Sequence, residues 1–124
     1  MLETGMTLSL DKIVNPEDTA LKVGSGGMEV FATPMLVALM ENAAFTLAQK
    51  EMEPGETTVG ISINIKHLKA NLVGDKLHCV AEIIKVDGRK LDFHVKVTQG
   101  DVTVGEGEHS RFIVNEEKFL NKLK

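Results

Sequence analysis

The sequence predicts an α+β fold in which a curved antiparallel sheet of about five strands wraps one long central helix. The run Pro34–Ala48 (PMLVALMENAAFTLA) is apolar on nearly all faces and holds one charged residue, Glu41. That pattern is typical of an enclosed helix. Several strand-like segments then follow one another, separated by turns that contain Gly and Asp. Residues 1–124 are the usual length of one domain, so we expect a single domain.

The first part of the chain supplies a strand, a loop and the helix. Residues 6–14 alternate like a short strand, and the Gly-rich residues 23–28 (VGSGGM) predict a mobile loop. The central helix is expected over residues 33–51, with Thr33 as its cap and the EPG sequence at 53–55 as its stop.

The second part of the chain predicts an antiparallel meander and a terminal helix. Turn signals stand at 73–75 (VGD), 87–88 (DG) and 100–101 (GD). A capping Asn115 and apolar residues at helical spacing predict a short helix over 115–124. The expected strands are 58–68, 76–86, 90–98 and 102–114.

Composition limits the partners and the compartment. The net charge of −4 without a basic block argues against nucleic acid as a partner. The N-terminus lacks a signal-peptide pattern, and no window reaches the ~18 apolar residues of a membrane span, so we expect a cytoplasmic protein without a membrane partner. The single Cys79 fits a reducing compartment. A chain this short can hardly enclose a long apolar helix, which predicts a homodimer and leaves a tetramer open.

Glu41 and His67 are the strongest candidates for chemistry. A carboxylate inside an apolar helix costs several kcal/mol in desolvation unless it is paired. His67 ends the predicted inward face of the strand 58–68, so two ionisable groups share one apolar layer and predict a functional pair. A core histidine bonded to a carbonyl, and a Glu41 ion pair with Arg111, are the structural alternatives. The other residues of that predicted face are Ile61, Ile63 and Ile65.

Thr33 offers a hydroxyl at the start of the same helix. It stands eight residues before Glu41, which places the two about 12 Å apart along a helix axis. Either a substrate spans them or a dimer brings Thr33 of one chain toward Glu41 of the other. A capping role for Thr33 is the alternative, and the two roles are compatible. The four histidines and Cys79 lack clustered ligand spacing, so we expect no metal.

Three segments together resemble a known family. The segments VFATPMLVALMENAA, VGISINIKHLKANLVGDKL and GEGEHSRFIV are similar, in order and spacing, to the fluoroacetyl-CoA thioesterase branch of the hotdog superfamily over most of residues 5–120. The resemblance implies a hotdog fold and hydrolysis of an acyl-CoA to free acid and CoA at a dimer interface, with CoA as part of the substrate and no separate cofactor. It implies a catalytic set of Thr33, Glu41 and His67, with Gly60 and Arg111 binding the oxyanion or the substrate.

Two departures bear on the substrate. Members that select fluoroacetyl-CoA carry a Phe-bearing lid where this chain has LKVGSGGME, and Pro34 replaces their Gly. The acyl group, short or unusual, therefore stays open, as does whether Glu41 is nucleophile or general base. A non-catalytic acyl-CoA binding or sensing module is the alternative function. Candidates for the CoA phosphates are Lys66, Lys69, Arg89 and Lys90.

Overall fold

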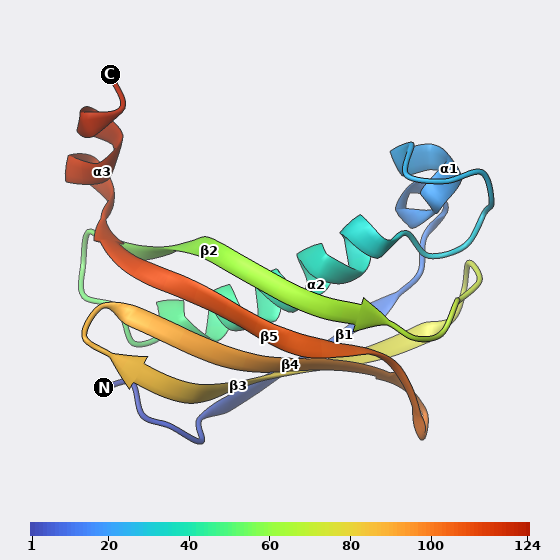
Figure 1. The fold of residues 1–124 in the computed structure, drawn as a ribbon, viewed down its shortest axis with the longest axis horizontal. Helices are drawn as coiled ribbons and strands as arrows, with labels where there is room; N and C mark the ends of the chain where they lie inside the picture. The colour runs from blue at the N-terminus through green and yellow to red at the C-terminus, as the bar shows by residue number, and fades with distance from the viewer.

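The computed structural model describes residues 1–124 and contains one sheet of five antiparallel strands, in the order β1-β3-β4-β5-β2 (Figure 1). This confirms the predicted fold class. The strands are β1 Thr7–Ile13, β2 Glu56–His67, β3 Lys76–Asp87, β4 Lys90–Gln99 and β5 Val102–Asn115.

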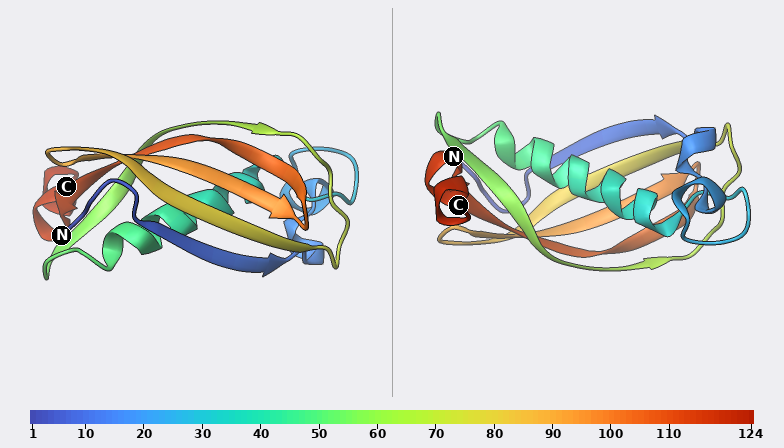
Figure 2. Two further views of the ribbon diagram at one scale, coloured as in Figure 1. Left: turned by 90° about the horizontal axis from the view of Figure 1, so that it is seen from below. Right: turned by 90° about the horizontal axis from the view of Figure 1, so that it is seen from above.

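The central helix α2, Thr33–Gln49, lies along the concave side of the sheet, and the edge strands β1 and β2 curl at either side of it (Figure 2). Its inner face packs on the apolar rows of β3 and β4, which alternate with the period of two expected of a half-covered sheet. The helix can sit this close partly because Gly105 lacks a side chain: a methyl group there would lie 2.7 Å from Leu36 Cδ2. The buried residues of α2 are Leu36, Leu39, Met40, Ala43, Ala44, Leu47 and Ala48.

The predicted meander is wrong for β2. Strands β3, β4 and β5 do form a meander, but β2 pairs with β5 and never with β3. The segment 68–75 that connects β2 to β3 is far longer than a tight hairpin turn. It carries the chain across to the other side of the sheet, where β3 pairs with β1. As a result β2 is an edge strand, hydrogen-bonded on one side only.

The predicted inner face of β2 is wrong at Ile61, because the strand has a β-bulge between Gly60 and Ser62. The extra residue shifts the alternation, so that Gly60 and His67 both face α2 although one is even-numbered and the other odd. Ile61 lies in the bulge and is 52% exposed, whereas we expected it on the inner face. Without this bulge the two residues would point to opposite faces.

Three short elements complete the chain. A 3-10 turn, η1 (Pro16–Asp18), and α1 (Ala20–Val23) precede the Gly-rich loop and lie near the start of α2, at the end of the molecule opposite α3 (Glu116–Lys122) (Figure 1). None of the helices is both long and apolar enough to span a membrane.

Candidate active site

The Thr33 hydroxyl lies against the His67 ring at the start of α2. Thr33 Oγ1 is 2.7 Å from His67 Nδ1. The expected capping role is wrong, because Ala32 is the N-cap, Thr33 is already helical and no side chain caps this helix. The Thr33 hydroxyl is therefore free to bond the ring of His67, which is the last residue of β2.

Only one of the two ring nitrogens of His67 makes a hydrogen bond. Its Nε2 is buried and makes no hydrogen bond, which is rare for a buried polar atom. Burial lowers the pKa of His67, while the backbone of Lys69 opposes this effect, so the ring is neutral near pH 7 and can accept a proton. The Phe31 ring meets it edge-on, with 6.4 Å between centroids. A cavity of about 340 Å³ opens beside Thr33 and His67, which lies within the range of small-molecule sites.

Glu41 faces Gly60 of β2, two turns further along the helix. A methyl group placed on Gly60 would lie 3.3 Å from Glu41 Oε2, 3.3 Å from His109 Cε1 and 3.5 Å from Arg111 Nη1. These three side chains therefore converge on the one position in β2 that has no side chain. Glu41 is half-buried and forms no ion pair with Arg111, so the structural alternative for Glu41 is wrong.

Arg111 is buried and held by neutral groups. Its Nε donates to Thr58 Oγ1 at 2.8 Å and its Nη2 to the Thr58 carbonyl at 3.0 Å. The guanidinium lies 5.6 Å from the centre of the Phe45 ring, in cation–π geometry. Burial lowers the pKa of Arg111, and the negative charge of Glu41 opposes this. A buried cation without a paired carboxylate is well suited to bind an anionic or polarised oxygen.

His109 belongs to this cluster, and the sequence analysis missed it. Its Nε2 is 3.1 Å from Arg111 Nη1 and its Nδ1 is 2.7 Å from the Ser62 carbonyl. The signal was available, because residues 109 and 111 stand two apart in one strand and so share a face. Metal-ligand spacing among the histidines does not reveal this pairing, whereas strand alternation does.

The predicted residues thus form two clusters within one chain. Thr33 and His67 meet at the start of α2, whereas Glu41 lies with Gly60 and Arg111 about 12 Å further along the helix axis.

The four candidates for the CoA phosphates are scattered. Only Lys69 lines the cavity beside His67, and its Nζ is 2.8 Å from Gln99 Oε1. Lys66 faces the other side of β2, opposite Glu106. Arg89 and Lys90 lie at the β3–β4 hairpin, at the α3 end of the molecule, where they pair with Glu56 and Asp92 at 3.8 and 3.7 Å.

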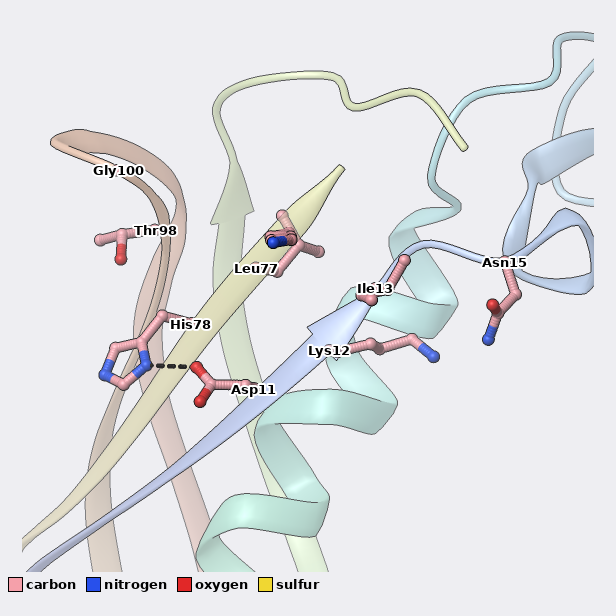
Figure 3. A pocket seen from close by; sticks show the side chains of 9 residues that line it. Asp11, Lys12, Ile13, Asn15, Leu77, His78, Thr98 and Gly100 are labelled. Atoms are coloured by element: carbon pink, nitrogen blue, oxygen red, sulfur yellow. Dashed lines mark hydrogen bonds and ion pairs between the residues drawn. The ribbon is translucent and has the colours of Figure 1, made fainter. Parts of the chain in front are cut away.

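A second hollow, of about 690 Å³, lies on the outer face of the sheet over β1, β3 and β4 (Figure 3). It holds an Asp11–His78 pair, with Oδ1 and Nδ1 2.7 Å apart. The Asp11 side chain is 84% exposed, so water solvates it and screens its charge. None of the predicted catalytic residues lines this hollow. No group of three or more His, Cys, Asp or Glu in the chain is arranged to hold a metal ion.

An apolar helix wrapped by a curved five-stranded antiparallel sheet is the arrangement of the hotdog fold, and polar residues gather here between the helix and an edge strand. A thioesterase superfamily member from Thermus thermophilus shares this fold, with a TM-score of 0.89, 24% identity and coverage of 98% of this chain and 90% of that one. The family model for fluoroacetyl-CoA-specific thioesterases matches residues 14–117. The chain belongs to this family and is an acyl-CoA thioester hydrolase.

The individual relatives agree with this assignment. The fluoroacetyl-CoA thioesterase of Streptantibioticus cattleyicolor is 36% identical over 96 residues, which are 77% of this chain and 69% of that protein. A crystal structure of a fluoroacetyl-CoA thioesterase superimposes with a TM-score of 0.94 at 31% identity, covering 99% of this chain and 96% of that one. Variants of that enzyme have been solved with fluoroacetate and with acetyl-CoA. Because the family is one of enzymes, it favours the thioesterase over the non-catalytic binding module.

Proposed function

We propose that the protein hydrolyses a short acyl-CoA at a site shared by two copies of the chain, with Glu41, His67 and Thr33 as the catalytic residues. The observation that carries the proposal is the unpartnered, buried Nε2 of His67 beside a small cavity. A buried nitrogen in that state is costly unless a ligand or water uses it. Residues 1–124 act as one domain in this proposal.

The chemistry follows from the residue types. The Glu41 carboxylate either removes a proton from the attacking water or attacks the thioester carbonyl itself. In the second case a mixed anhydride forms, and water then cleaves it to the free acid and the Glu41 carboxylate. The carbonyl carbon gains the new C–O bond, its oxygen takes up negative charge, and the C–S bond then breaks. The Gly60 N–H and the Arg111 guanidinium stabilise that oxygen. His67 orients the attacking water, or accepts a proton from it and passes that proton to the leaving CoA thiolate, and Thr33 holds its ring through the 2.7 Å bond to Nδ1.

A second copy would complete the site. Strand β2 is an edge strand of 12 residues with a free side, and long bare edges invite pairing with another strand. Beside it, α2 leaves Pro34, Ala38 and Asn42 exposed. Antiparallel pairing of β2 with its copy brings the Gly60 half of one strand alongside the His67 half of the other. Glu41 of one chain then approaches Thr33 and His67 of the second copy, and dimers could pair further into tetramers.

The volume of the cavity and the ligands bound by a related enzyme both favour a short acyl group. The cavity beside His67 holds about 340 Å³, and the related enzyme has been solved with fluoroacetate and acetyl-CoA. Lys69 at its rim is the best placed of the four candidate phosphate ligands. The buried free thiol of Cys79, whose pKa burial raises to about 12, suits the reducing cytoplasm.

The first test is thiol release from acetyl-, fluoroacetyl-, branched, medium-chain and aromatic acyl-CoAs, with wild type and Glu41→Gln side by side. We expect release from the short substrates and a loss of about 10³-fold in kcat for Glu41→Gln, because a general base or nucleophile is removed. Full turnover by folded Glu41→Gln would remove Glu41 from the mechanism. Binding of acyl-CoA without release by wild type would point to the non-catalytic module instead.

A mixed dimer tests whether the site is shared. Glu41→Gln and His67→Ala, each inactive alone, are refolded together in equal amounts. If each site takes Glu41 from one chain and His67 from the other, half of the dimers carry one intact site of two, and about one quarter of wild-type activity returns. If both residues act within one chain, no activity returns.

A further inference from the structure

The His109 ring occupies a fixed place between β2, β4 and Arg111. It is 1% exposed and stacks on Phe93, with ring centroids 6.1 Å apart and planes at 28°. Its Nδ1 is 2.7 Å from the Ser62 carbonyl oxygen, and its Nε2 is 3.1 Å from Arg111 Nη1. Both ring nitrogens therefore have a polar neighbour.

Those two neighbours determine where the ring carries its proton. A guanidinium can only donate hydrogen bonds, so His109 Nε2 accepts and is unprotonated. A carbonyl oxygen can only accept, so Nδ1 carries the proton and donates it to Ser62. The contacts are satisfied together by a single state, the neutral ring protonated on Nδ1.

Arg111 and His109 hold β2 on both sides of the bulge. Arg111 bonds the side chain and carbonyl of Thr58, two residues before Gly60. His109 bonds the carbonyl of Ser62, two residues after it. The Nε2 to Nη1 contact joins the two side chains to each other. Together they bracket the point at which Glu41 Oε2 approaches the strand.

We propose that His109 is a positioning residue, which together with Arg111 clamps β2 around Gly60 and fixes the Gly60 backbone and the guanidinium opposite Glu41. The inference rests on the proposed function, in which Gly60 and Arg111 receive the oxygen of the thioester. A clamp of this kind holds the oxyanion donors in place before the substrate arrives, and such preorganisation acts on the transition state more than on binding.

The charged groups that face His109 are Arg111 from its own strand and Glu41 from α2; its contacts on β2 and β4, Ser62 and Phe93, are uncharged. Burial and, more weakly, Arg111 lower the pKa of His109, while the Ser62 carbonyl and Glu41 oppose them. Protonation would turn Nε2 into a donor aimed at Arg111 Nη1. The clamp therefore opens in acid, when two donors face each other.

Two measurements on the whole protein test the clamp. Long-range ¹H–¹⁵N correlation spectra of the ¹⁵N-histidine protein at pH 7.5 should show His109 neutral and protonated on Nδ1. Thiol release should show kcat lower by about 10- to 100-fold for His109→Phe, which keeps the stacking and loses both bonds, with KM changed less than about threefold. His109→Asn, which can still donate to Ser62, should lose less and remain folded. The matched controls are His94→Phe and His94→Asn on the outer face of β4, where His94 bonds Glu106.

Several results would overturn the inference. A His109 ring that is protonated on Nε2 would contradict the clamp whatever the kinetics, and so would equal losses of kcat in the His94 controls. Wild-type kcat in His109→Phe and His109→Asn, with Glu41→Gln inactive in the same assay, would remove His109 while leaving the proposed function in place. Activity in Glu41→Gln as well would instead remove the proposed function, and the spectra would still decide the protonation state.

Discussion

The inner and outer faces of the sheet each carry two histidines, and their surroundings differ. On the outer face, His78 and His94 each lie 2.7 Å from a carboxylate oxygen, of Asp11 and Glu106 respectively. On the inner face, His67 bonds a hydroxyl and His109 a carbonyl and a guanidinium, and neither forms an ion pair.

This difference shows where a histidine can do chemistry in this fold. A histidine–carboxylate pair in water is screened and contributes little. Burial lowers the pKa of both inner rings, so they stay neutral. His67 keeps its Nε2 free for a substrate, whereas both nitrogens of His109 are bonded within the protein. The nearest match to a catalytic His–Asp pair therefore lies on the outer face, while the inner face holds the groups suited to act on a substrate.

The largest effect should come from the inner histidine with a free nitrogen. His67→Ala removes both the ring that Thr33 holds and the unpartnered Nε2. We expect kcat to fall by about 10²- to 10⁴-fold, the usual contribution of a proton-transfer group. Steady-state thiol release measures it, and His78→Ala on the outer face is the matched control. Similar losses in both variants would erase the contrast between the faces.

The next effect should come from filling the space that the inner cluster shares. Gly60→Ala places a methyl group 3.3 Å from both Glu41 Oε2 and His109 Cε1, which is tight for a carbon contact. We expect a loss of about 1 kcal/mol in the free energy of unfolding from overpacking and a clear fall in kcat. Chemical denaturation and thiol release measure the two. Gly107 is a poor control because the strand backbone itself crowds it, and Gly100 is a poor control because its φ of 57° is strained for alanine. Gly27→Ala, where an added methyl group meets nothing within 4 Å, therefore serves for stability. Unchanged kcat in Gly60→Ala would show that the side chains around Gly60 can move to accept the methyl group without loss of activity.

The pH dependence of stability should report the inner histidines. Because the pKa values of His67 and His109 are lowered on folding, the unfolded chain binds more protons below its histidine pKa of about 6.5. Their stabilising effect is thus fully present above about pH 6.5 and is lost as the pH falls through the lowered pKa values. Urea unfolding from pH 8 to 5 should show this decline. His109→Asn should flatten it.

The smallest effect should come from the outer pair. Asp11→Asn removes the charge beside His78, but the Asp11 side chain is 84% exposed. We expect less than about 0.5 kcal/mol in the free energy of unfolding and unchanged thiol release. A loss of activity in this variant would give the outer hollow (Figure 3) a part in the reaction.

Much of this molecule could be predicted from local patterns. The apolar run of α2 and the alternation of β4 follow directly from helix and strand periodicity. Glu41 and His67 could be singled out because ionisable groups interrupt those apolar patterns. The resemblance to the fluoroacetyl-CoA thioesterase family points to Glu41 and His67 as well.

The remainder depends on features that periodicity does not encode. The bulge at Gly60–Ser62 is a single extra residue, and strand pairing fixes it only when β5 is in place. The Thr33 to His67 contact joins positions 34 residues apart. Pairing of β2 with β5 rather than β3 likewise depends on how the whole sheet closes around α2. His109 differs from these, because strand alternation alone places it on one face of β5 with Arg111.

The bulge also determines where β2 can change in length. Because side chains alternate along a strand, removing Ile61, the extra residue of the bulge, would leave a regular strand in which Gly60 and His67 stand six residues apart and still face the same side. Adding or removing one residue in the regular part of β2, between Ser62 and His67, while the bulge is kept would instead turn His67 to the side opposite Gly60. The tight turns after β3 and β4, around Gly88 and Gly100, join strands at the surface and carry no such parity. A tag, a longer loop or a grafted peptide belongs in those turns.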